Sequence, residues 1–274
     1  MLGRARKMVK KVGFITLHGM GETKKNYADD LLEGVKERLG DDAWSEVSFQ
    51  SVYYQKILQD PQYEFYDSVK GKVDSKAMRR FWLYKFSDPA ALEYSRNIPD
   101  SAYELSQRKI FEALSHIQDE LEDPEAPVIV VAQSLGGQVI SNYIWDANRP
   151  EKPGYGLWRH YELDEHPFQR LQSMRLLLTT GCNIPIFVGG LPSVQRPPIG
   201  RPHPEMIWEN YYDEDDALGW PLQDLNDAYD DLVTDIAVNV GGKLSSWNPL
   251  AHSKYWSDKD IQQPVADHLA SFLE

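Results

Sequence analysis

The chain has 274 residues, of which 42% are hydrophobic, and a formal net charge of −13. This composition allows a substantial buried core, and the acidic balance argues against nucleic acid or an anionic membrane surface as the main partner. No run approaches the roughly 20 apolar residues that a membrane span needs, which excludes stable membrane insertion.

The redox and targeting signals are sparse. A single cysteine, Cys182, leaves no internal disulfide, and we expect it to be a packed, nearly apolar side chain rather than a nucleophile. The basic residues 1–11 lack the long apolar run of a secretory signal. We therefore expect a cytoplasmic protein.

Six short apolar runs predict strands, with helix-like segments between them. In chain order they are VGFITLH (12–18), EVSFQSVYY (46–54), PVIVVA (127–132), MRLLLTTG (174–181), MIWENYY (206–212) and DIAVNVG (235–241). Helical spacing of apolar residues predicts helices over 26–40, 101–123 and 264–274. The alternation predicts an α/β fold, with a mostly parallel twisted sheet of about six strands and helices on both faces.

Two stretches interrupt this alternation. Residues 55–97 are rich in aromatic side chains and too long for a structureless connection, so we expect a helical insertion that lies over the sheet, either as an ordinary covering layer or as a cap over the substrate. Residues 185–205 are dense in proline and glycine and predict a long loop. No repeat or linker divides the chain, so residues 1–274 are expected to form one domain.

The segment VIVVAQSLGGQVI (128–140) places Ser134 between a buried strand and a helix. A sharp strand-to-helix turn crowds the residues two positions before and after the bend, and small residues, Ala132 and Gly136, occupy them. Such a turn exposes the serine hydroxyl at the carboxyl end of the sheet. It also aims the backbone N–H of Leu135 at developing negative charge, so Leu135 is one expected oxyanion donor.

A serine nucleophile needs a base and an acid that orients the base. Of the seven histidines, His252 lies in the loop between the last strand and the last helix, which predicts that it reaches the same sheet edge as Ser134. Four acids, 213–216, follow the penultimate strand. We favour Asp216 because the apolar ALGWPL after it would fold inward, with Asp213 as the alternative.

The first strand ends in LHGMGET, where two glycines let the backbone approach a bound group closely. The N–H of Met20 in this segment is the second expected oxyanion donor.

The order HGMG, AQSLGG, acid and late histidine resembles the α/β-hydrolase fold of serine hydrolases, which includes lipases and esterases. The resemblance runs from about residue 12 to the end, and Ser134, Asp216 and His252 follow the order of nucleophile, acid and base. Two departures are Ala132, where glycine is usual, and Gln133, where histidine is common.

The resemblance and the residues together predict hydrolysis of an ester-like acyl bond, without metal or cofactor, on a small-molecule ester with an apolar acyl or aryl group. Two alternatives remain: a catalytically inactive binding module on the same fold, and an acyltransferase that uses the same triad. No HExxH motif, P-loop or GxGxxG motif is present.

Overall fold

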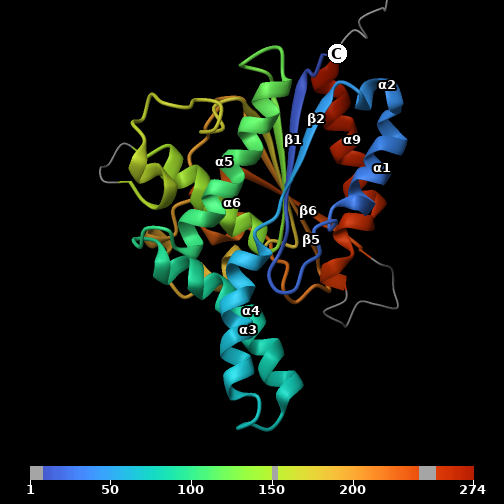
Figure 1. Ribbon diagram of the computed structural model, residues 1–274. Coiled ribbons are helices and arrows are strands. Elements are labelled where there is room, and N and C mark those ends of the chain that lie inside the picture. Colours follow the sequence, from blue (N-terminus) through green and yellow to red (C-terminus); the bar gives the residue numbers. More distant parts are fainter. Residues whose placement is uncertain (1–8, 150–153, 241–250) are drawn as a thin grey trace, which may run out of the picture.

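All six predicted strands lie in one sheet of the computed structural model, which describes residues 9–149, 154–240 and 251–274 (Figure 1). They are β1 (Val12–Leu17), β2 (Val47–Val52), β3 (Val128–Gln133), β4 (Met174–Thr180), β5 (Ile207–Asp213) and β6 (Val233–Val238). The order is β2-β1-β3-β4-β5-β6 and every neighbouring pair is parallel, which confirms the α/β prediction. Most of the basic tail and residues 241–250 of the histidine loop lie outside the described residues.

Helices cover both faces of the sheet, because its strands are apolar on both sides. Helices α1 (Asp29–Leu39) and α9 (Lys259–Leu273) pack on one face, and α5 (Ala102–Glu120) and α6 (Leu135–Ala147) on the other (Figure 1). Phe14 of β1 belongs to the core between the sheet and helices α1 and α9, whereas Ile15 and Leu17 belong to the core between the sheet and helices α5 and α6. The shorter helices are α2 (Asp41–Trp44), α7 (Ile184–Val188) and α8 (Asp227–Asp230).

The predicted helical insertion is a pair of helices that pack against each other, α3 (Gln55–Val69) and α4 (Lys76–Ser95). This α3–α4 hairpin projects from the body of the molecule at the carboxyl edge of the sheet (Figure 1). Asp88, which is 1% exposed, holds its base: the carboxylate accepts hydrogen bonds from Gln59 Nε2 (2.6 Å), Gln62 Nε2 (2.5 Å) and the N–H of Gly21 (2.7 Å). The hairpin is thereby tied to the loop after β1.

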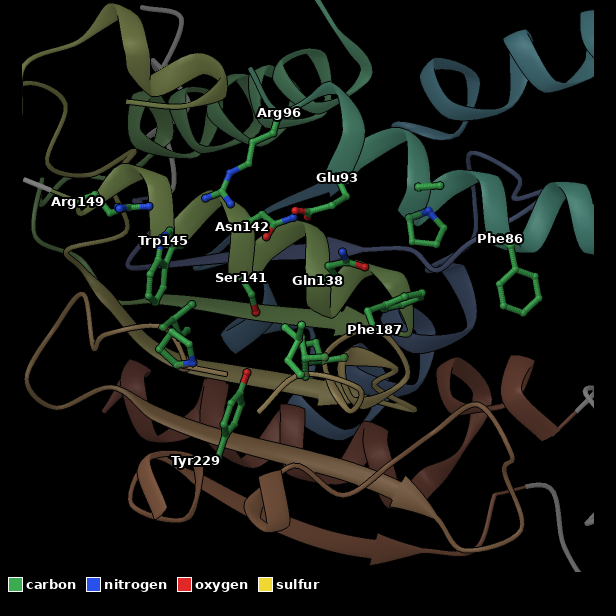
Figure 2. Close-up of a pocket in the computed structure, with 17 residues that line it drawn as sticks. Phe86, Glu93, Arg96, Gln138, Ser141, Asn142, Trp145, Arg149, Phe187 and Tyr229 are labelled. Atoms are coloured by element: carbon green, nitrogen blue, oxygen red, sulfur yellow. The ribbon is translucent and has the colours of Figure 1, made fainter. Parts of the chain in front are cut away.

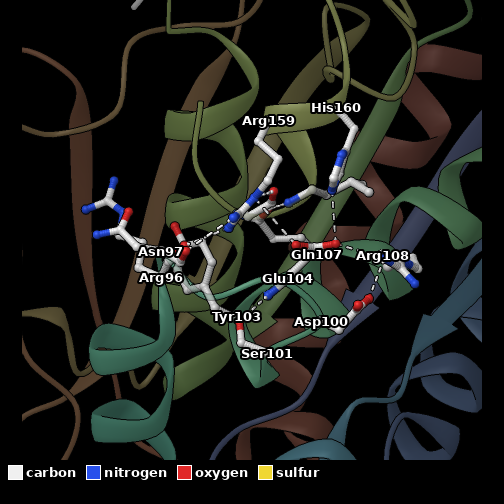
Figure 3. A network of polar contacts seen from close by, with 12 residues as sticks. Arg96, Asn97, Asp100, Ser101, Tyr103, Glu104, Gln107, Arg108, Arg159 and His160 are labelled. Carbon is white, nitrogen blue, oxygen red and sulfur yellow. Dashed lines mark hydrogen bonds and ion pairs between the residues drawn. The ribbon is translucent and has the colours of Figure 1, made fainter. Parts of the chain in front are cut away.

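A second polar network fixes the chain where α4 ends (Figure 3). Arg159, in the 3-10 helix Gly156–His160, donates to the carbonyls of Arg96 and Asn97, each at 3.2 Å. The buried carboxylate of Glu104 on α5 contacts Arg108 Nη2 at 2.8 Å and His160 Nε2 at 3.3 Å. The 3-10 helix Gly156–His160 is therefore joined through charged side chains to the end of α4 and the first turn of α5, which lie more than fifty residues earlier in the chain.

The stretch 185–205 was predicted to be a loop throughout. Its first residues instead belong to helix α7 (Ile184–Val188), and a 3-10 turn follows at Ser193–Gln195. Pro185 favours this short helix, because proline in a first helical turn lacks only an N–H that would have no partner there. The remainder is irregular, as predicted. Within the described ranges, no helix combines the length and apolarity needed to cross a membrane.

Candidate functional site

Ser134 lies at a strained bend between β3 and α6. Its backbone angles are φ 53° and ψ −123°, a conformation that a residue with a side chain rarely adopts and that functional sites often retain. A Cβ on Gly136 would lie 2.8 Å from the carbonyl oxygen of Leu17 and 2.9 Å from that of His18. The bend therefore packs directly onto the end of β1, and only glycine fits two positions after the serine.

His252 and Asp216 form a buried pair at the same edge of the sheet. His252 Nδ1 is 2.7 Å from Asp216 Oδ2, and the side chains are only 10% and 3% exposed. A carboxylate at this distance favours the tautomer with the proton on Nδ1, which leaves a lone pair on Nε2. Among the described residues, His252 Nε2 is buried and has no hydrogen-bond partner. This nitrogen is available to accept a proton.

Several groups keep the Asp216 carboxyl ionised. Burial, the largest single cause, raises its pKa, but the hydrogen bonds to this carboxyl and the charge of His252 together outweigh burial and lower the pKa below its ordinary value. The N–H of Leu218 and the hydroxyl of Tyr255, each at 3.0 Å, act in the same direction. An ionised carboxylate can both orient the imidazole and stabilise its protonated form.

Asp213, the alternative acid, has a different environment. Its carboxylate accepts the N–H of Asp215 at 2.8 Å and that of Val240 at 2.7 Å. Its own N–H donates to the hydroxyl of Tyr255, which in turn donates to Asp216. In this structure, Asp216 contacts the imidazole of His252, while Asp213 braces the backbone around it.

Ser134 and the His252–Asp216 pair both lie beside the residues at the end of β4. The N–H of Ser134 donates to the carbonyl of Thr180 at 2.9 Å, and a Cβ on Gly181 would lie 3.1 Å from both His252 Cε1 and Asp216 Oδ2. Ser134 Oγ lies 3.5 Å from Asn183 Nδ2 and makes no hydrogen bond to His252 Nε2. The groups share one edge, with the serine turned toward Asn183. In sites without ligand, such catalytic contacts are often loose.

The HGMG segment lies beside the serine. A Cβ on Gly19 would be 2.9 Å from Ser134 Cβ and 3.4 Å from its Oγ, so the loop passes as closely as glycine permits. Lys85 of α4 donates to the carbonyl of Met20 at 3.2 Å, next to the Asp88 contact with Gly21. Leu135 is the first residue of α6, so its N–H has no acceptor within the helix. Both predicted oxyanion residues therefore lie next to Ser134.

His18 has a structural position in this loop. Its ring stacks on Tyr54, with centroids 4.0 Å apart, Nε2 accepts the N–H of Tyr54 at 3.2 Å, and Nδ1 lies 2.8 Å from the carbonyl of Gly19. Burial lowers the pKa of His18 from 6.5 to about 4, so the ring is neutral at pH 7. Both nitrogens are occupied, in contrast to His252.

Sequence reasoning missed three residues of this site. Tyr255 and Asn183 reach it only through the tertiary fold, and no sequence pattern distinguishes them. Gly181 has a positive φ of 51° directly after β4, and a glycine ending an apolar strand was the available signal. Cys182 is fully buried, and burial raises the pKa of its thiol to about 12, which agrees with a packed residue. No cluster of metal-ligating side chains occurs within the described residues.

Comparison with known proteins bears on the fold. No protein-family model and no curated protein matches the sequence. An inhibited esterase B from Lactobacillus rhamnosis is 11% identical, with a TM-score of 0.50 over 98% of this chain and 78% of that chain. A lipase/esterase from Lactobacillus plantarum is 12% identical, with a TM-score of 0.49 over 96% and 88%. The chain has an α/β-hydrolase-like fold, as the sequence resemblance predicted.

Proposed function

We propose that the protein is a serine hydrolase that cleaves an ester-like acyl bond of a small molecule with an apolar acyl or aryl group. The observation that carries the proposal is the buried His252–Asp216 pair at the sheet edge where Ser134 lies in a strained turn; in the part of the chain that the structure describes, nothing bonds to the imidazole Nε2. The single buried cysteine suits the cytoplasmic location that we also propose.

In the proposed mechanism, Ser134 Oγ attacks the ester carbonyl while His252 Nε2 accepts the hydroxyl proton. The N–H groups of Leu135 and Met20 stabilise the oxyanion, and the imidazolium returns its proton to the departing alcohol. Water then attacks the acyl-serine with His252 again as base, which releases the acid and restores the serine. Asp216 stays ionised and stabilises the imidazolium in both steps.

The test is the turnover of an activated ester, nitrophenyl acetate, by the Ser134→Ala variant. Loss of the nucleophile should lower kcat/KM by about 10⁴-fold or more while the fold remains intact. The exposed Ser271 on α9 supplies a matched control, because Ser271→Ala removes a hydroxyl on the opposite face of the sheet. Near-normal turnover in Ser134→Ala would contradict the mechanism. Product analysis with added alcohols separates hydrolysis from acyl transfer.

A further inference from the structure

A cavity of about 700 Å³ runs along the outer side of α6, between the second half of α4 and the segment after β4 (Figure 2). We call it the α6 groove. Its walls are mainly apolar and aromatic, with Phe86 and Pro89 from α4, Trp145 from α6, and Phe187 from α7. The volume is that of a typical small-molecule site, and the aromatic walls suit a flat ring.

One side of the groove is polar. Gln138, Ser141 and Asn142 are spaced so that they lie on the same face of α6, and all three line the cavity (Figure 2). Gln138 Oε1, Ser141 Oγ and Asn142 Nδ2 are buried and have no hydrogen-bond partner among the described residues. Buried polar atoms are nearly always satisfied, so this row indicates a ligand that supplies both donors and acceptors. A hydroxyl group does both.

The charges at the groove favour an uncharged ligand. Arg96 lines the cavity but is paired with Asp146, with Nη2 at 3.1 Å from Oδ1. The other charged lining residues are one acid, Glu93, and one base, Arg149, whose guanidinium lies over the Trp145 ring at 5.5 Å. With Asp146 counted beside its partner Arg96, the two bases and two acids at the groove balance, so no excess of either sign selects an ion.

The groove begins close to the proposed nucleophile. Gln138 lies four residues after Ser134, about one helical turn away. Ile184, which lines the groove, follows Asn183, whose amide is 3.5 Å from Ser134 Oγ. The polar row from Gln138 to Asn142 extends about 6 Å along α6, and the lining continues to Trp145, about 10 Å from Gln138. Ser134 itself does not line the groove, so an ester with its carbonyl at Ser134 would reach the groove past Gln138 and Ile184.

We propose that the α6 groove binds the body of the substrate, and that this body is an uncharged aromatic ring bearing hydroxyl groups. The ring packs between the aromatic walls, and the hydroxyls bond to Gln138, Ser141 and Asn142. This assignment rests on the proposed function only for the position of the ester carbonyl. Binding of the ring in the groove does not depend on any reaction at Ser134.

The test measures binding by titration calorimetry with two uncharged amides, caffeamide, which carries two ring hydroxyls, and cinnamamide, which carries none. The wild type should bind caffeamide about 10-fold more tightly, because hydrogen bonds to otherwise unpartnered groups are gained. In Ser141→Ala/Asn142→Leu the ratio should fall at least about 3-fold, because two of the three polar partners are absent and only Gln138 remains. Ser271→Ala should keep the ratio of the wild type. If the double variant does not fold, as judged by circular dichroism, Ser141→Ala alone should reduce the ratio.

Equal affinities of the wild type for the two amides, or an unchanged ratio in a folded groove variant, would overturn the assignment. A competition experiment tests whether the groove and Ser134 belong to one site. Caffeamide should competitively inhibit the hydrolysis of nitrophenyl acetate by the wild type. Tight binding of caffeamide without inhibition would overturn the role of the groove as a substrate site. If the wild type hydrolyses no ester, the proposed function fails, while the ratio of affinities still decides whether the groove binds the ring.

Discussion

Two buried aspartates show how similar side chains serve different purposes in this molecule. Asp216 and Asp146 are 3% and 0% exposed, and each carboxylate accepts a hydrogen bond from a tyrosine hydroxyl, Tyr255 and Tyr103 respectively. Around Asp146, Arg96 and Gln107 complete a network that joins α4, α5 and α6. Around Asp216, the principal partner is His252, whose other nitrogen has no partner among the described residues.

The difference lies in the kind of partner. Asp146 binds a guanidinium, a tyrosine hydroxyl and a side-chain amide, none of which acts as a base at neutral pH, so its network holds the helices together. Asp216 binds an imidazole whose Nε2 is buried and has no hydrogen-bond partner among the described residues. Burying such a nitrogen costs free energy unless a substrate or reacting group bonds to it. We propose that the His252–Asp216 pair, at the same sheet edge as the strained Ser134, serves chemistry, whereas the Asp146 network serves structure. Substitutions at the two aspartates test this distinction.

The largest contrast should come from changing each aspartate to asparagine. Asp216→Asn should lower kcat for nitrophenyl acetate by about 10⁴-fold, because an amide can stabilise the tautomer that has the proton on Nε2. Asp146→Asn should leave kcat within a few-fold of the wild type. The measurement is steady-state kinetics at neutral pH on variants with native circular dichroism. Equal losses in both variants would remove the distinction.

A smaller effect on turnover is expected at Asp88, which holds the loop that carries Met20. Because loss of an oxyanion donor costs roughly 10²–10³ in kcat, loosening this loop in Asp88→Asn should cost about 10- to 100-fold. Asp60→Asn, at an exposed aspartate of the same hairpin, is the matched control. Wild-type kcat in Asp88→Asn would separate the hairpin from the chemistry.

Stability should respond at Asp146. Asp146→Asn leaves the buried Tyr103 and Gln107 and the partly buried Arg96 incompletely paired, and should lower the free energy of unfolding by about 1–3 kcal/mol. Urea denaturation monitored by tryptophan fluorescence measures the change. Glu112→Gln, on the exposed side of α5, serves as the control. An unchanged free energy of unfolding would show that the network does not stabilise the helices.

A further effect, which develops only below about pH 6.5, concerns the second buried imidazole, His18, whose nitrogens are both occupied. Its pKa is about 4 in the folded chain and 6.5 when solvated, so only the unfolded chain binds a proton between these values. Stability should therefore fall as the pH falls from 6.5 to about 4, by up to about 1.4 kcal/mol per pH unit from this group. Denaturation across this window should show a shallower dependence in His18→Gln. The same slope in both proteins would contradict a neutral buried ring.

Sequence reasoning performed best where burial dominates. All six residues of β3 are buried, and such a strand reads as a continuous apolar run. It performed less well where a partner sets the limits. Strand β6 was predicted over 235–241 but spans Val233–Val238, because it pairs with β5 from Trp208↔Val233 to Asp213↔Val238. The residues of a strand do not by themselves determine how it aligns with its neighbour, so the limits of β6 could not be predicted from its own sequence.

In the candidate site, too, some residues could be predicted from the sequence and others could not. The crowded bend at Ser134 was predictable because small residues must flank it. Asp216 was favoured because the chain after it turns inward, and the N–H of Leu218 does bond back to its carboxylate at 3.0 Å. Tyr255, Asn183 and the α6 groove were not predictable, since they depend on side chains that meet only after folding.

The most direct test of the central claim, that Ser134 is an activated nucleophile, is labelling with a fluorophosphonate followed by peptide mass spectrometry. The account predicts a covalent phosphonyl group on Ser134 of the wild type and much slower labelling of folded Asp216→Asn, because the imidazole is no longer oriented as a base. Absence of labelling on the folded wild-type protein, or a label on another residue, would contradict it.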